Sequence, residues 1–196
     1  MANKATKELF LEKTIQAVAQ VGMENLRTKM VADFAGFSEA TMFRFFPDKD
    51  SMLCETFLEV DRRVSEVFLN DFDGDEFAHR PAGEILHDNW LRMYSYLISH
   101  KEETLYLIRF RYSALYTDRI RARRMAYNGA FEKPYECLLK AGVLGKETYR
   151  GFLINYLFEM TLCFAEKIVS GRLANSPEME EQMWKAIYAA SEVFME

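Results

Sequence analysis

The sequence predicts an all-α protein, and three observations lead to that class. Apolar residues recur at three- and four-residue intervals along most of the chain, as in helices that bury one face. No stretch of any length alternates apolar and polar residues as a half-buried strand does. The 196 residues include only four prolines, which break few helices. Because 49% of the residues are apolar, the chain can bury a core rather than remain disordered.

Charge and cysteine usage exclude several classes of protein. A net charge of −5 argues against unselective coating of nucleic acid, although a locally positive face still permits selective DNA binding. The cysteines at 54, 137 and 163 are too scattered for a disulfide framework or a zinc site. The N-terminus lacks a signal-peptide core, and the most apolar run, 152–165, is too short to span a bilayer. We therefore expect a cytoplasmic protein that needs no membrane, metal or cofactor.

A first helix is predicted over 4–21, and two short helices follow it. Gly22 ends the first helix, as a residue in the left-handed conformation does. The short helices, 28–35 and 39–46, are joined by Gly36-Phe37-Ser38, in which Gly36 tolerates a tight turn and Ser38 can cap the second helix. The apolar side chains that can close a small shared core are Val31, Ala32, Ala35, Phe37, Met42 and Phe46.

This arrangement is a helix-turn-helix pattern, whose second helix is of the kind that enters a DNA major groove. After it, Asp48 is placed to cap a long helix that begins near residue 49. Residues 70–83 read as a solvated loop. Their alternating aspartates resemble a calcium loop, but the glycine falls at position 4 and Ala82 occupies position 12. The further predicted helices cover 84–99, 101–116, 118–141, 146–170 and 177 to the end.

The last two predicted helices carry more apolar surface than one small domain buries. The run 152–165 is apolar on every side, and the final helix has a stripe of large apolar side chains. Pairing with the same helices of a second subunit would bury both surfaces, and an intramolecular core is the alternative. The predicted interface consists of Phe152, Tyr156, Met160, Cys163, Met183, Trp184, Ile187 and Tyr188.

Residues 15–53 resemble the TetR family of one-component transcriptional regulators. The resemblance rests on V-A-x-x-A-G-F-S at 31–38, T-M-F-x-F-F at 41–46 and the following Lys49, against I-A-x-x-A-G-V-S and T-L-Y-x-Y-F in the family. It implies a helix-turn-helix DNA-binding domain over 1–48 and a helical ligand-binding and dimerisation domain over 49–196. It further implies a homodimeric repressor that a small molecule releases from a palindromic, double-stranded operator.

The resemblance also assigns candidate DNA contacts, namely Thr28, Lys29, Ser38, Glu39, Ala40, Thr41, Phe43, Arg44 and Lys49. Two departures from the family pattern alter this surface. Phe43 and Phe45 replace tyrosines, so their hydroxyl contacts to phosphate are lost, although Phe43 can touch a thymine methyl group. Glu39 would repel phosphates unless it accepts a hydrogen bond from a cytosine amino group.

The C-terminal part is rich in aromatic side chains, which we expect to line an effector pocket. One helical face in it combines apolar and cationic groups that suit an amphipathic ligand. The candidate lining is Trp90, Tyr94, Tyr106, Arg109, Phe110, Ser113, Tyr116, Tyr127 and Phe131. Such aromatic residues are also common in ordinary cores. The arginines at 119, 121, 123 and 124 are too scattered around a helix to share one ligand, so we expect a solvated face.

Two other functions are compatible with the sequence. Glu39, Phe43 and Phe45 also suit an interaction module that has lost DNA affinity and acts through another regulator. A helical enzyme that uses the C-terminal cavity is the second alternative. The sequence offers no nucleophile–base pair, glycine-rich phosphate loop or paired carboxylates, so we expect a regulator rather than an enzyme.

Overall fold

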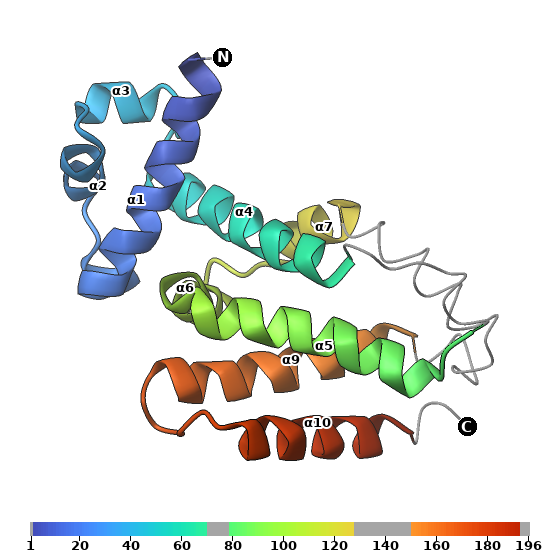
Figure 1. The fold of residues 1–196 in the computed structure, drawn as a ribbon. Coiled ribbons are helices and arrows are strands. Elements are labelled where there is room, and N and C mark those ends of the chain that lie inside the picture. The colour runs from blue at the N-terminus through green and yellow to red at the C-terminus, as the bar shows by residue number, and fades with distance from the viewer. Residues whose placement is uncertain (1, 70–78, 128–149, 193–196) are drawn as a thin grey trace. The chain divides into compact units, whose positions relative to one another are not determined.

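A computed structural model gives the protein's structure and describes residues 2–69, 79–127 and 150–192. Over these residues the regular structure is entirely helical, as predicted (Figure 1). The chain forms two compact units. The N-terminal unit comprises Met1–Arg63 and Glu102–Ala126, and the C-terminal unit comprises Val64–Lys101 and Tyr127–Glu196. The predicted DNA-binding domain over 1–48 and ligand-binding domain over 49–196 stay a prediction, and helix α4 (Lys49–Leu69) is continuous across the boundary between the two compact units.

Helix α1 (Ala2–Asn25) forms one wall of the N-terminal unit. Leu11, Ile15 and Val18 are buried along one stripe, which is the face that the sequence predicted. Gly22 adopts a left-handed φ of 78°, and one further turn completes the helix. The predicted break at this glycine is therefore confirmed.

The helix-turn-helix follows the predicted geometry closely. Helix α2 (Thr28–Ala35) ends at Gly36, whose φ of 73° is left-handed and whose N–H donates to the last turn. Phe37 is the exception, because it is 39% exposed and packs at the edge against Phe10, with ring centroids 5.5 Å apart. The other predicted core side chains are buried except Ala35, which is half-buried; the buried ones are Val31, Ala32, Met42 and Phe46.

Helix α3 (Glu39–Phe43) is shorter than the predicted 39–46. The N–H groups of Phe45 and Phe46 both donate to the carbonyl of Met42, so the chain tightens into turns. Pro47 explains the early end, because a proline disfavours helical geometry in the residue before it. Helix α4 then starts as predicted, since the N–H of Ser51 donates to Asp48 Oδ1 over 2.7 Å.

Helices α6 (Lys101–Arg111) and α7 (Asp118–Tyr127) complete the N-terminal unit. Phe57 of α4 stacks on Phe110 of α6 with centroids 4.4 Å apart, and Tyr116 meets Phe57 edge-on. The sequence predicted that α6 would continue to residue 116. It stops earlier because Ser113 Oγ bonds the Phe110 carbonyl and accepts from the N–H of Leu115, which replaces helical pairing.

Ion pairs connect the helices of this unit, and they correct the prediction of a solvated arginine face. Arg124 of α7 donates through Nε to both oxygens of the fully buried Asp61, over 3.0 and 2.8 Å. Arg123 lies 2.7 Å from Glu55 of α4, which also pairs with Lys7 of α1. Two of the four arginines therefore connect α7 to α4 through ion pairs.

The C-terminal unit packs α5 (Ala82–Ser99), α9 (Arg150–Val169) and α10 (Pro177–Glu192) side by side (Figure 1). Trp90 of α5 donates through Nε1 to Thr161 Oγ1 of α9 over 2.9 Å. Tyr94 Oη donates to Asn175 Oδ1 over 2.8 Å. The Trp90 ring stacks on the Tyr94 ring, with centroids 5.1 Å apart. The aromatic face of α5 therefore forms part of this core.

Parts of the predicted layout lie outside the described residues, namely most of the 70–83 loop and the segment from 128 to 149. In the described part of the chain, none of the helices combines the length and the hydropathy of a membrane-spanning segment.

Candidate nucleic-acid interface and effector region

The first turn of α3 is fixed by the side chain that precedes it. Ser38 Oγ accepts from the N–H of Thr41 over 3.2 Å, which confirms the predicted cap. The two hydroxyls, Ser38 Oγ and Thr41 Oγ1, lie 3.0 Å apart. This pairing fixes the direction of α3 relative to the turn.

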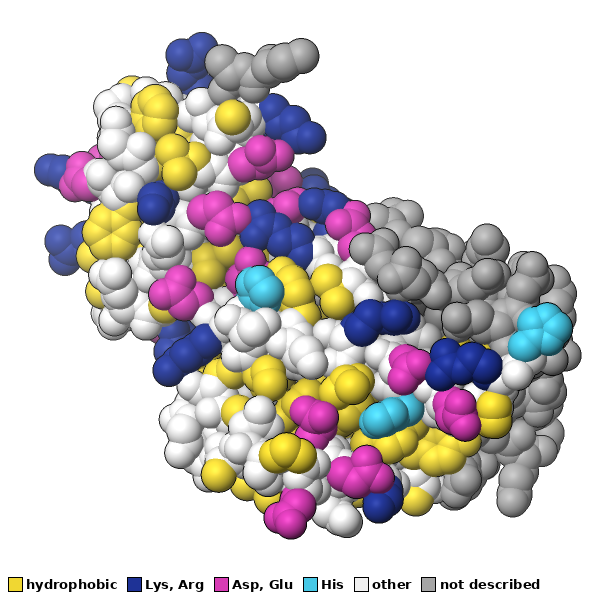
Figure 2. Space-filling view, viewed as in Figure 1, with side chains coloured by type: hydrophobic (Ala, Val, Ile, Leu, Met, Phe, Trp, Pro, Cys, Tyr) yellow, Lys and Arg dark blue, Asp and Glu magenta, His cyan; other side chains and the backbone are white. Residues whose placement is uncertain are grey.

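One side of α3 is exposed to solvent. Ala40, Phe43 and Arg44 are exposed on it, with Phe43 at 45%, while Met42 is buried underneath. Lys29 is exposed at the start of α2, and Lys49 is half-buried at the start of α4. These are positions at which the sequence expected DNA contacts. Figure 2 shows that basic and acidic side chains are interspersed over helices α1 to α3, which we call the N-terminal head, and are not segregated.

The two phenylalanines that replace family tyrosines have different surroundings. Phe45 is half-buried, and its ring centroid lies 5.8 Å from that of Phe10. The Phe45 ring therefore belongs to the small core of the N-terminal head. Phe43 presents its ring to solvent on α3. An apolar ring at that place can contact a thymine methyl group in a major groove.

Sequence reasoning missed one contact on this surface. Thr28 Oγ1 of α2 donates to Glu39 Oε1 of α3 over 2.6 Å. The two residues are eleven apart in sequence, and only the turn at Gly36 brings the two helix starts together. No local spacing rule could have found the pair.

Five of the candidate effector residues lie in the N-terminal unit, where each has a packing or capping contact. Tyr106 is buried and donates to the Leu53 carbonyl over 2.8 Å. Arg109 Nη1 donates to the Val18 carbonyl of α1 over 2.7 Å. Phe110, Ser113 and Tyr116 have the core and turn contacts described above. Their expected role toward an effector stays a prediction.

Trp90 and Tyr94 lie on the face of α5 that packs against α9 and α10. Burial, and secondarily the charge of Glu180, raises the pKa of Tyr94 to about 12, so its hydroxyl stays protonated and donates to Asn175. The side chain of Tyr127 and all of Phe131 lie outside the described residues.

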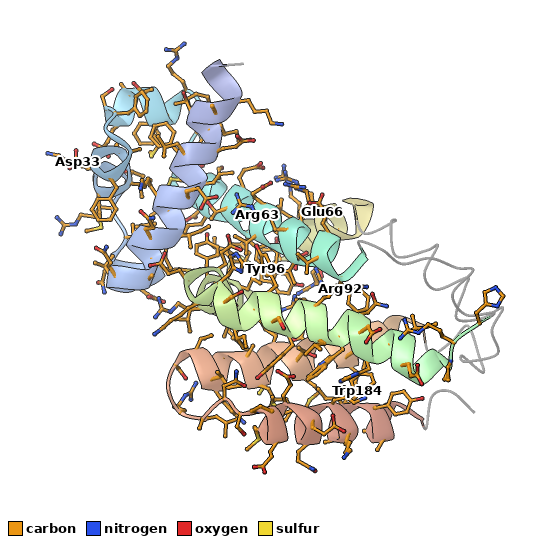
Figure 3. The ribbon with its side chains drawn as sticks, in the orientation of Figure 1. Asp33, Arg63, Glu66, Arg92, Tyr96 and Trp184 are labelled. Carbon is orange, nitrogen blue, oxygen red and sulfur yellow. The ribbon has the colours of Figure 1, made fainter. Side chains whose placement is uncertain are left out.

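The opposite face of α5 borders a groove of about 590 Å³. It is an open surface groove rather than an enclosed cavity. Figure 3 shows Arg92 and Tyr96 on α5, whereas Trp184 belongs to α10. Helical geometry explains the separation, because positions 90 and 94 lie about half a turn away from 92 and 99. The lining residues are Val67, Asp88, Leu91, Arg92, Ser95, Tyr96 and Ser99.

The outer surfaces of α9 and α10 revise the predicted dimer interface. Met183 and Ile187 are 2% and 1% exposed within one subunit, so they cannot add buried area to an interface and that part of the prediction is wrong. Trp184 and Tyr188 are half-buried, and the ring centroid of Trp184 lies 5.0 Å from that of His87 of α5 and 5.1 Å from that of Tyr188. Figure 2 shows hydrophobic surface over α5 and α10.

An outward strip remains on α9. Tyr156 and Met160 are half-buried and Cys163 is exposed, at spacings of four and three residues that place them on one face. Gln182, Ala186 and Ala189 are likewise exposed along one side of α10. The side chain of Phe152 is not among those described.

Comparisons with known proteins agree with this architecture. Residues 4–56 match the family model for bacterial regulatory proteins of the tetR family. A TetR family transcription regulator from Marinobacter aquaeolei VT8 is 23% identical, with a TM-score of 0.76 and 96% of each chain covered. A putative TetR family regulator from Vibrio parahaemolyticus is 18% identical, with a TM-score of 0.71 and coverage of 94% of this chain and 97% of that one.

A more distant likeness involves the regulator FadR from Bacillus subtilis, solved in complex with stearoyl-CoA. It is 11% identical, with a TM-score of 0.70 over 92% of this chain and 96% of that chain. At this identity the likeness concerns the fold. Residues 4–56 therefore form the N-terminal domain of the tetR family of bacterial regulatory proteins, and the chain as a whole shares the all-helical fold of these solved regulators.

Proposed function

We propose that the protein is a homodimeric transcriptional repressor that binds a palindromic operator and leaves it when a small molecule binds. The observation that carries the proposal is the capped recognition helix. Ser38 fixes the start of α3, and the exposed side of that helix offers Ala40, Phe43 and Arg44 to a major groove. Lys29 and Lys49 supply positive charge at the starts of the neighbouring helices.

Arg44→Ala and Lys49→Ala test DNA binding directly. Each is expected to weaken operator binding by about tenfold or more, because each removes a cation that reaches a base edge or a phosphate. Retardation of the protein's own upstream DNA, measured over a range of salt concentrations, is the readout. Sedimentation should show an unchanged oligomeric state.

The same measurements address the alternative of an interaction module. If the wild type gives no sequence-selective retardation at low salt, the repressor proposal fails. Equal binding by wild type and both variants would place the DNA contact elsewhere on the protein.

Dimerisation through α9 and α10 would supply the second DNA-reading head. A two-fold interface repeats the same patch on both subunits, and two such heads match the two halves of a palindrome. The strip of Tyr156, Met160 and Cys163 supports this interface, because Met160 is half-buried and Cys163 is exposed on one face of α9. The exposed alanines of α10 allow a partner helix to approach closely.

Cys163 provides a test of that interface. In a dimer built on the α9 strip, the two Cys163 thiols lie near the symmetry axis, so a short bismaleimide should link the subunits efficiently. A variant with Cys54 and Cys137 changed to Ser should still cross-link, whereas Cys163→Ser should not, as judged by denaturing gel electrophoresis. A stable dimer that is never linked through Cys163 would exclude this strip.

The groove on the outer face of α5 is the region that we propose for the effector. Val67, Leu91 and Tyr96 offer apolar surface, while Arg92 and the serines at 95 and 99 offer charge and hydrogen bonds. This combination favours an amphipathic molecule with an anionic group. To release DNA, the effector must bind the DNA-incompetent arrangement more tightly than the competent one.

A further inference from the structure

The contact between Thr28 and Glu39 places a carboxylate on the surface that is proposed to meet DNA. Thr28 is the first residue of α2 and Glu39 the first residue of α3, and their side chains are joined over 2.6 Å. Both side chains are only half-buried. The hydrogen-bond donor is a neutral hydroxyl, so this contact places no positive charge beside the carboxylate.

A fixed negative charge at this place is unfavourable for binding any DNA backbone. Two unit charges about 4 Å apart in water repel each other by about 1 kcal/mol, which is roughly a fivefold change in affinity. The same surface exposes Lys29 and Arg44, whose charges favour any phosphate backbone. Glu39 therefore opposes the sequence-independent part of binding.

The hydrogen bond also orients the carboxylate. Thr28 holds Oε1, and the second oxygen, Oε2, can accept a hydrogen bond from another donor. In a major groove, the base donor that suits a glutamate is the N4 amino group of cytosine. A carboxylate that is fixed before binding loses less conformational freedom when it forms such a contact.

We propose that Glu39 is a specificity-determining residue, which suppresses binding to non-cognate DNA and reads one cytosine in each operator half-site. Thr28 is its positioning residue. This inference rests on the proposed DNA-binding function. It assigns Thr28 a role different from the direct DNA contact that the resemblance implied, because its hydroxyl proton is directed to Glu39.

The test compares three variants on two DNA probes, a selected operator and a random duplex of equal length. Glu39→Gln keeps the shape and removes the charge. Thr28→Val keeps the charge and removes the hydroxyl that orients it. Asp33→Asn removes one negative charge from exposed α2, where Figure 3 shows the Asp33 side chain projecting outward, and serves as the matched control.

Glu39→Gln is expected to bind random DNA about fivefold more tightly and the operator no more tightly than wild type, so the specificity ratio falls. Selection from randomised operators should then show a relaxed requirement at one base pair in each half-site. Thr28→Val should keep weak binding to random DNA and lose several-fold in operator affinity. Asp33→Asn should leave the specificity ratio unchanged.

An equal effect of Glu39→Gln on both probes, or no effect, would overturn the inference, as would the same loss of specificity in Asp33→Asn. Failure of the proposed function is distinguishable, since it would appear as absence of operator binding by the wild type. Sensitivity to Arg44→Ala without sensitivity to Glu39→Gln would refute this inference alone.

Discussion

Replacing Asp61 by Asn is expected to destabilise the N-terminal unit by about 3–5 kcal/mol, the range for breaking one side of a buried ion pair. Asp61 is fully buried in α4. It accepts both bonds from Arg124 of α7, and Arg111 Nη1 of α6 lies 3.9 Å away. The asparagine keeps the volume but leaves two guanidinium groups facing a neutral amide in a poorly solvated place.

The free energy of unfolding in urea, followed by circular dichroism, measures this loss. Asp118→Asn is the matched control, because Asp118 pairs with Arg121 on the surface of the same unit with its side chain 95% exposed. That variant should lose at most about 1 kcal/mol. Equal losses of unfolding free energy in the two variants would mean that the burial of Asp61 does not increase its contribution to stability.

Arg63→Met is expected to cost about 2–4 kcal/mol at neutral pH, because it leaves three carboxylates without their shared cation. Arg63 of α4 donates to Glu12 of α1, to Glu59 one turn earlier and to Glu103 of α6. The Glu103 side chain is only 12% exposed. Figure 3 shows Arg63 on α4, from which it connects these two helices.

The effect of Arg63→Met should depend on pH. Burial opposes ionisation of Glu59, but hydrogen bonds and the charges of Arg62 and Arg63 outweigh it and lower its pKa below 4.5. A carboxylate with a lowered folded-state pKa contributes stability that is complete above its unfolded pKa and is lost as pH falls through the folded value. The difference between wild type and variant should therefore be full at pH 7 and narrow below about pH 4.5.

Arg62→Met is the control for this variant. Arg62 pairs with Glu59 along the same helix, with its side chain 42% exposed, and such pairs contribute about 0.3–0.5 kcal/mol. Urea unfolding at pH 7 and at pH 4 supplies both comparisons. A constant difference at the two pH values would show that Arg63 acts through packing rather than through charge.

Local signals in the sequence were sufficient for the helix-turn-helix. The left-handed Gly36, the Ser38 cap and the Asp48 cap each act within a few residues, so the residue types alone predict them. The same rules predicted α6 poorly. Apolar spacing continues past its end, while the competing hydrogen bonds of Ser113 depend on the conformation of the chain.

Burial was harder to predict than helicity. An apolar stripe shows that a helix has a buried face, but not which element covers it. Met183 and Ile187 looked like interface residues and proved to be core, whereas Cys163 remained on the outer surface. Arg124 looked solvated and proved to be the partner of a buried aspartate, 63 residues away in sequence.

Residue types alone predicted the helical class, the cap of α3 and the family resemblance, because caps, turns and apolar spacing are properties of neighbouring residues. Three features emerged only from the folded chain: Thr28 holds Glu39, Arg63 joins α1 to α6, and the two faces of α5 border a core and a groove. These contacts join residues far apart along the chain. Their formation depends on how whole helices pack, which no local pattern specifies.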